Sequence, residues 1–172
     1  MMADTDDGLA RINALPAEEA ERALRACCAS AAWVEAVSGG RPYPDRATVT
    51  DRSAAVLAGL DWPGIREALD AHPRIGERAR QPGREAAWSA VEQSGMDGAT
   101  SEVRAALVEA NHAYEERFGH VFLIFATGKT DTEMLSAARE RLRHDDATER
   151  EIVRTELAKI VALRLAKLLD AS

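Results

Sequence analysis

Nowhere in this chain do β-branched and polar residues alternate over more than a few positions, so the period of two that marks a half-buried β-strand is missing. Alanine, leucine, glutamate and arginine dominate instead, and these residues favour helices. The length of 172 residues suits one domain. We therefore predict an all-α fold, a single-domain bundle of about eight helices over residues 1–172, with a flexible N-terminus at 1–7.

Capping residues predict where several of these helices begin. Ser30 is expected to cap a short helix that ends at Gly39 and Gly40. Thr50 and Asp51 are expected to open a helix that reaches Leu60, and Thr148 is a candidate cap for the last helix, residues 147–170. The stretch 118–125 (FGHVFLIF) is short, apolar and aromatic, and is compatible with extended, helical or mixed structure.

Charge and cysteine content argue against several classes of protein. The net charge of −7 is unfavourable for a nucleic-acid surface, because the phosphate backbone would repel it. The two cysteines, Cys27 and Cys28, are neighbours and are interpreted as reduced core residues of a cytosolic protein. No apolar stretch has the pattern of a signal peptide or the length of a membrane span. We therefore expect a cytoplasmic protein with neither a nucleic-acid nor a membrane partner.

An arginine interrupts the apolar stripe of the last predicted helix. Apolar residues recur there at steps of three and four, which places them on one helix face: Val153, Leu157, Ile160, Val161, Leu165 and Leu168. Arg164 lies within this stripe, where an unpaired charge would be very costly. It could form a structural ion pair, or lie at the edge of the stripe with its head group in water. Alternatively, its planar fork could bind a substrate carboxylate.

A polar trio stands on another predicted helix, in the segment WSAVEQ. Ser89, Glu92 and Gln93 are spaced i, i+3 and i+4, so they project from one side of the helix, and Trp88 flanks them with an apolar plate. A carboxylate kept out of water beside an indole suits acid–base chemistry. The alternative is an ordinary solvated polar face.

The segment around His72 reads as an ordered loop from residue 72 to 82. Pro73 disfavours helical geometry at His72, so a helix ends there, and Gly76 permits a tight turn shortly after. An imidazole held on such a rigid corner suits proton transfer near neutral pH. A capping or hydrogen-bonding role within the loop would produce the same pattern.

In this order, these segments resemble the 2-oxo-4-hydroxy-4-carboxy-5-ureidoimidazoline (OHCU) decarboxylase family. The similarity covers nearly the whole chain and lies in the following motifs: Ile12–Pro16, Cys27–Trp33, Arg41–Tyr43, His72–Gly76, Trp88–Gln93, Asn111–Tyr114, Phe118–Gly119, the stretch through Ala126–Gly128, Arg141–Leu142 and Arg164–Leu165. His120 is a departure, since an apolar or aromatic residue is expected at that position.

The resemblance implies the family's all-α fold, a homodimer, and a carboxy-lyase that converts OHCU to (S)-allantoin, the last step of urate oxidation to allantoin in purine catabolism. It implies no cofactor, no metal and a small-molecule ureide substrate. The catalytic residues that it carries over are His72, Glu92 and Arg164. The substrate-binding residues are Pro73, Ser89 and Gln93, with Phe122 and Ile124 as a backbone-bonding wall.

Three other functions are compatible with parts of the pattern. One is a non-catalytic helical module that binds a ureide or a purine. Another is a metal-dependent, amidohydrolase-like enzyme that would use His72 and Glu77. The third is a structural helical adaptor, which would give no reason for Arg164 to lie within an apolar stripe.

Overall fold

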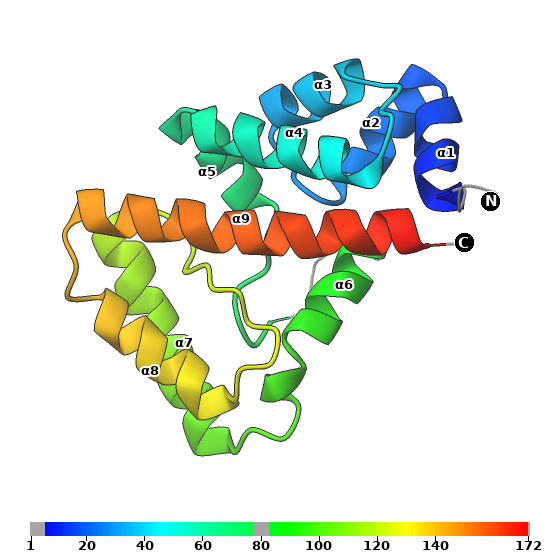
Figure 1. Ribbon diagram of the computed structural model, residues 1–172. Coiled ribbons are helices and arrows are strands. Elements are labelled where there is room, and N and C mark those ends of the chain that lie inside the picture. The colour runs from blue at the N-terminus through cyan, green and yellow to red at the C-terminus, as the bar shows by residue number, and fades with distance from the viewer. Residues whose placement is uncertain (1–5, 78–82, 172) are drawn as a thin grey trace. The chain divides into compact units, whose positions relative to one another are not determined.

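The computed structural model describes residues 6–77 and 83–171, and within these ranges every regular element is a helix (Figure 1). The described residues form nine α-helices and one 3-10 helix: α1 (Asp7–Ala14), α2 (Ala17–Arg25), α3 (Ala31–Gly39), α4 (Arg46–Gly59), α5 (Trp62–Asp70), α6 (Arg84–Glu92), η1 (Ser94–Met96), α7 (Ser101–Phe118), α8 (Asp131–Arg141) and α9 (Asp146–Asp170). The all-α prediction is confirmed. None of these helices is long and apolar enough to cross a membrane.

The described chain divides into two compact units. Unit 1 holds the residues up to Ala68 and those from Ala158 onward, and unit 2 runs from Leu69 to Leu157. Of the predicted flexible terminus, residues 1–5 lie outside the described residues. Asp6 already caps α1, because its carboxylate accepts a hydrogen bond from Leu9 N at 3.0 Å.

In unit 1, α1 and α4 are capped by the carboxylates of Asp6 and Asp45. The predicted start at Thr50 is wrong: α4 begins at Arg46, since the Asp45 carboxylate accepts from Thr48 N at 2.7 Å. Ser30 occupies the predicted N-cap position of α3 but makes no capping bond with its side chain.

The core of unit 1 is mostly aliphatic and includes Trp33 and Tyr43. Trp33 is fully buried and donates from Nε1 to the Ser53 carbonyl at 3.3 Å. Cys27 and Cys28 are buried free thiols, as predicted for small core residues. The C-terminal half of α9 contributes the buried residue Leu168.

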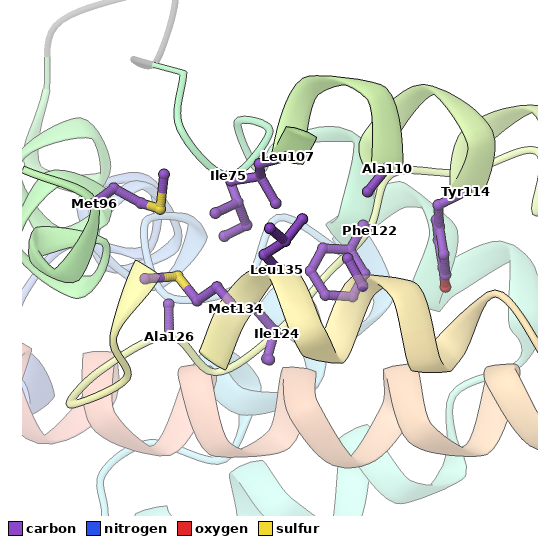
Figure 2. Packing of buried hydrophobic residues seen from close by; sticks show 11 residues of the cluster. Ile75, Met96, Leu107, Ala110, Tyr114, Phe122, Ile124, Ala126, Met134 and Leu135 are labelled. Carbon is purple, nitrogen blue, oxygen red and sulfur yellow. The ribbon is translucent and has the colours of Figure 1, made fainter. Parts of the chain in front are cut away.

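The core of unit 2 is built by α7, α8 and the segment 121–126, which is neither helix nor strand. Helices α7 and α8 pack side by side, and the side chains between them point toward one another (Figure 2). The start of α8 is fixed by a capping box between Thr130 and Glu133. The cap of α9 is Asp145, whose carboxylate accepts from Thr148 N at 2.7 Å, so Thr148 lies in the first turn and not at the cap.

The periodicity of α9 agrees with its burial. Every residue of the predicted stripe is buried: Val153, Leu157, Ile160, Val161, Arg164, Leu165 and Leu168. The apolar face inferred from steps of three and four is therefore confirmed along the whole helix.

Candidate functional site

The loop that carries His72 follows α5 directly. His72 N donates to the Leu69 carbonyl at 2.9 Å, and Glu77 N donates to the Arg74 carbonyl at 3.0 Å. Gly76 adopts φ +90°, a conformation that other residues rarely reach. The prediction of a loop is confirmed for residues 72–77, whereas residues 78–82 lie outside the described part of the chain. The loop leaves the side chains of His72 and Pro73 half-buried.

The polar trio on α6 is not a solvated face. Ser89 is 6% exposed and Glu92, the last residue of the helix, is 7% exposed. Gln93 follows the helix end, and its Oε1 accepts a hydrogen bond from Gly76 N at 2.9 Å. The end of α6 is thereby joined to the His72 loop, so two of the predicted site segments meet within unit 2.

The predicted wall lies in the core of the same unit. Phe122 and Ile124 are 1% and 5% exposed and share one apolar cluster with Ile75 of the loop (Figure 2). Since both side chains face this core, a ligand contact by these residues would have to use their backbone groups. Arg141 donates to the carbonyl between them, that of Leu123.

A buried charged network fixes this segment. Glu149 is fully buried and accepts hydrogen bonds from Tyr114 Oη and Arg141 Nε, both at 2.6 Å, and lies 3.1 Å from His144 Nδ1. Its carboxylate also forms an ion pair with Arg141 Nη2. Burial by itself would raise the pKa of Glu149, but the hydrogen bonds from Arg141 and Tyr114 outweigh it, and the pKa lies below its ordinary value. The guanidinium of Arg141 also lies 4.7 Å from the ring centroid of Phe122.

His120 fits this aromatic region although its residue type departs from the expected pattern. It is 7% exposed, and its ring meets that of Tyr114 edge-on at 5.4 Å between centroids. Its Nδ1 lies 3.1 Å from the Val121 carbonyl. The imidazole therefore packs against the neighbouring aromatic ring and also contacts the Val121 carbonyl.

Arg164 belongs to unit 1. It is 4% exposed, so the interpretation of an edge residue with a solvated head group is wrong. Its Nη1 donates to the Ala26 carbonyl at 3.2 Å.

A pocket of about 250 Å³ opens in unit 2 between the loop and α7. Its lining includes Arg74, Gly76, Glu77, Leu107 and Asn111, and none of the catalytic or substrate-binding residues that the resemblance implies. Among residues 6–77 and 83–171, no three His, Cys, Asp or Glu side chains are grouped so as to hold a metal ion.

Four residues of this region were not predicted as functional: Asn111, Glu115, Arg141 and Glu149. Asn111 and Arg141 lie within motifs that carry the family resemblance, but nothing in those motifs indicates a partner. The spacing of Asn111 and Glu115, four residues apart on α7, was an available signal for a shared helix face.

Comparison with known proteins gives consistent results. Residues 13–166 match the family described as OHCU decarboxylase. The uric acid degradation bifunctional protein TTL of Arabidopsis thaliana is 32% identical over 157 residues, which are 88% of this chain and 48% of that protein, so the chain spans about half the length of this relative. The 2-oxo-4-hydroxy-4-carboxy-5-ureidoimidazoline decarboxylase of Amia calva is 29% identical over 137 residues, 78% of each chain. A crystal structure of OHCU decarboxylase in the presence of (S)-allantoin is similar with a TM-score of 0.75 and 27% identity, covering 86% of this chain and 96% of that one.

Proposed function

This chain belongs to the OHCU decarboxylase family, and we propose that it converts OHCU to (S)-allantoin and CO₂ without a cofactor, as the last step of urate oxidation to allantoin. The observation that carries the proposal is the family match over residues 13–166, which includes every predicted site residue. The burial of Ser89 and Glu92 supports it, because these polar groups are kept out of bulk water, as an acid–base site requires.

The substrate can accept its own electrons. In OHCU a ring C=N adjoins the carbon that bears both the carboxylate and the hydroxyl. When the bond to the carboxylate breaks, CO₂ leaves and the electron pair moves into the ring, with the imine nitrogen as its end point. The hydroxyl then becomes the ring carbonyl, and the ring nitrogen and the carbon bearing the ureido group each gain hydrogen, with one proton taken up overall. The protein has to orient the ring, stabilise the developing charge and deliver a proton to one face.

Each site residue then has a proposed role. His72 and Glu92 contact the hydroxyl and carboxylate end and steer the returning proton, and Arg164 binds the ring or an anionic oxygen. Ser89 and Gln93 hold the ureido arm. Pro73 and the backbone at Phe122 and Ile124 complete the substrate contacts. The buried position of Ser89 and the bond between Gln93 and the His72 loop support a shared site for these residues of unit 2.

We also propose that both units act as one functional domain, that the protein is a homodimer, and that it is cytoplasmic. The family match spans both units. Two free thiols buried in the core suit a reducing compartment. Analytical ultracentrifugation would test the dimer, and a monomer at micromolar concentration would contradict it.

The decisive assay is stereochemical. OHCU is generated from urate in the cuvette, and the circular dichroism of allantoin is followed with and without the protein. Spontaneous decay gives racemic allantoin, so a fast optically active signal is expected only with the enzyme. Absence of this signal in the presence of the protein, together with ureide binding, would identify a non-catalytic binding module. Loss of activity on chelation would instead indicate the metal-dependent alternative.

Substitution of the acid–base pair tests the assigned roles. We expect His72→Gln and Glu92→Gln each to lower kcat by about 10²-fold or more, a typical contribution of general acid–base catalysis. His112→Gln and Glu109→Gln are matched controls, because both residues are exposed on α7. Full activity of both site variants would show that neither residue takes part.

A further inference from the structure

The His72 loop contains little structure of its own. Over residues 71–77, His72 N donates to the Leu69 carbonyl and Glu77 N donates to the Arg74 carbonyl, and no helix or strand forms. Its position in unit 2 must therefore depend on contacts made by side chains of neighbouring elements.

Three consecutive loop residues are each held by a side-chain hydrogen bond. Arg74 donates to Glu115 through two parallel bonds, Nε to Oε1 at 2.6 Å and Nη2 to Oε2 at 3.0 Å. The carbonyl of Ile75 accepts from Asn111 Nδ2 at 3.1 Å, and Gly76 N donates to Gln93 Oε1 at 2.9 Å. A paired fork of this kind fixes direction as well as distance.

Two of these anchors come from one face of one helix. Asn111 and Glu115 lie four residues apart on α7, so their side chains project together. Asn111 is 4% exposed, and Ile75, whose carbonyl it holds, is 6% exposed and packs in the core of unit 2. The loop is therefore tied to α7 and to the buried core of the unit at residues 74 and 75, immediately after His72 and Pro73.

The exposure of the ion pair shows that its main effect is not on stability. The side chains of Arg74 and Glu115 are 38% and 23% exposed, and ion pairs this accessible to water contribute little to folding. The pair can still affect the reaction rate through the position of the loop, since a displacement of about 1 Å in a catalytic group can lower the rate by about 10²-fold.

We propose that Arg74, Glu115 and Asn111 form a clamp that fixes the His72 loop, and that they are positioning residues for the reaction assigned to His72. This inference rests on the proposed decarboxylase function. The three side chains act through the loop backbone and have no role in proton transfer themselves.

The chain provides a closely matched control for the test. In unit 1, Arg46 makes the same paired contact with Asp6, Nε to Oδ2 at 2.7 Å and Nη2 to Oδ1 at 3.2 Å, with side-chain exposures of 39% and 29%. Each arginine also has a second acidic neighbour, Glu77 for Arg74 and Asp170 for Arg46. Arg46→Ala therefore removes an equivalent ion pair that does not touch the loop.

The experiment measures kcat, KM and melting temperature for Arg74→Ala, Glu115→Ala, the double variant, Asn111→Leu and Arg46→Ala. We expect similar small falls in melting temperature for Arg74→Ala and Arg46→Ala. We expect kcat to fall about tenfold or more in the clamp variants only, with KM changed by less than about threefold. The double variant should lose no more than either single one, because each removes the same contact. Clamp variants with kcat within about threefold of the parent, or additive losses, would overturn the proposal.

Hydrogen exchange separates this proposal from the proposed function. The amides of His72, Gly76 and Glu77 are expected to exchange faster in Arg74→Ala and Glu115→Ala than in the parent, and at the parent rate in Arg46→Ala. This readout needs no substrate. A parent protein that does not accelerate decarboxylation would refute the enzyme, whereas unchanged exchange in the clamp variants would refute the clamp alone.

Discussion

Replacing Glu149 by alanine should be among the most damaging single changes in unit 2. Glu149 is fully buried: its side-chain exposure is 0%, and that of its partner Arg141 is 7%. The substitution leaves a buried guanidinium without its carboxylate and also removes the acceptor of the Tyr114 hydroxyl. Breaking a buried pair in this way costs about 3–5 kcal/mol.

This loss of stability is large enough to measure by equilibrium unfolding. Domains are stable by about 5–15 kcal/mol, so the loss is a large fraction of the total and is measurable by urea denaturation followed by circular dichroism. At roughly 2–4 °C per kcal/mol for a chain of this length, the melting temperature should fall by about 6–20 °C. Glu151→Ala is the control, because Glu151 is exposed two residues further along α9 and should change stability by about 0.5 kcal/mol or less.

Acidification provides a second measurement on the same pair. Because the folded-state pKa of Glu149 lies below its ordinary value of 4.5, its carboxylate adds stability above that pH, and this contribution is lost as pH falls through the lower folded-state pKa. The stability gap between the parent and Glu149→Ala should therefore narrow at acidic pH. A loss below about 1 kcal/mol at pH 7, or a gap that widens in acid, would refute the account of a buried ion pair.

Three further outcomes are expected. Burial raises the pKa of the Cys28 thiol to about 11, so a thiol reagent at pH 8 should leave it unmodified in the native protein and modify it in urea; equal rates would contradict its burial. Gly119 ends α7 with φ +77°, so Gly119→Ala should destabilise by about 1 kcal/mol, whereas an exposed Gly59→Ala change on α4 should not. The hydrogen bonds from the Arg46 side chain and from the Leu9 amide lower the pKa of Asp6 from 3.8 to about 2, so the Asp6 carboxylate should stay ionised at pH 3, and Arg46→Ala should raise that pKa part of the way toward 3.8 in an NMR pH series.

The sequence pattern predicted those helices in which buried residues recur at the regular helical spacing of three and four residues. The stripe of α9 is the clearest case, since residues from Val153 to Leu168 at steps of three and four are all buried and Arg164 is buried with them. The polar trio on α6 was also visible, because helix spacing alone places Ser89 and Glu92 on one side.

Features fixed by distant partners could not be predicted in the same way. The segment 121–126 shows neither the helix period nor the strand period. Its backbone forms hydrogen bonds with side chains of other elements, for example between Arg141 and the Leu123 carbonyl. Glu149 lies eight residues beyond Arg141 on the next helix, so no helix spacing links the pair. The start of α4 was missed for a local reason, since Asp45, Thr50 and Asp51 are all plausible caps and only the backbone conformation selects Asp45.

The bond between Gln93 and the His72 loop has a consequence for the ureide contact proposed for Gln93. A backbone N–H such as that of Gly76 can only donate, so it settles which end of the Gln93 amide faces it, namely the oxygen. The end that Gln93 can then present to a ureide is its NH₂ group, which pairs with a carbonyl oxygen and is repelled by another N–H. A urea-like arm has both kinds of group, so in the proposed site the loop would favour its carbonyl oxygen over its N–H as the partner of Gln93.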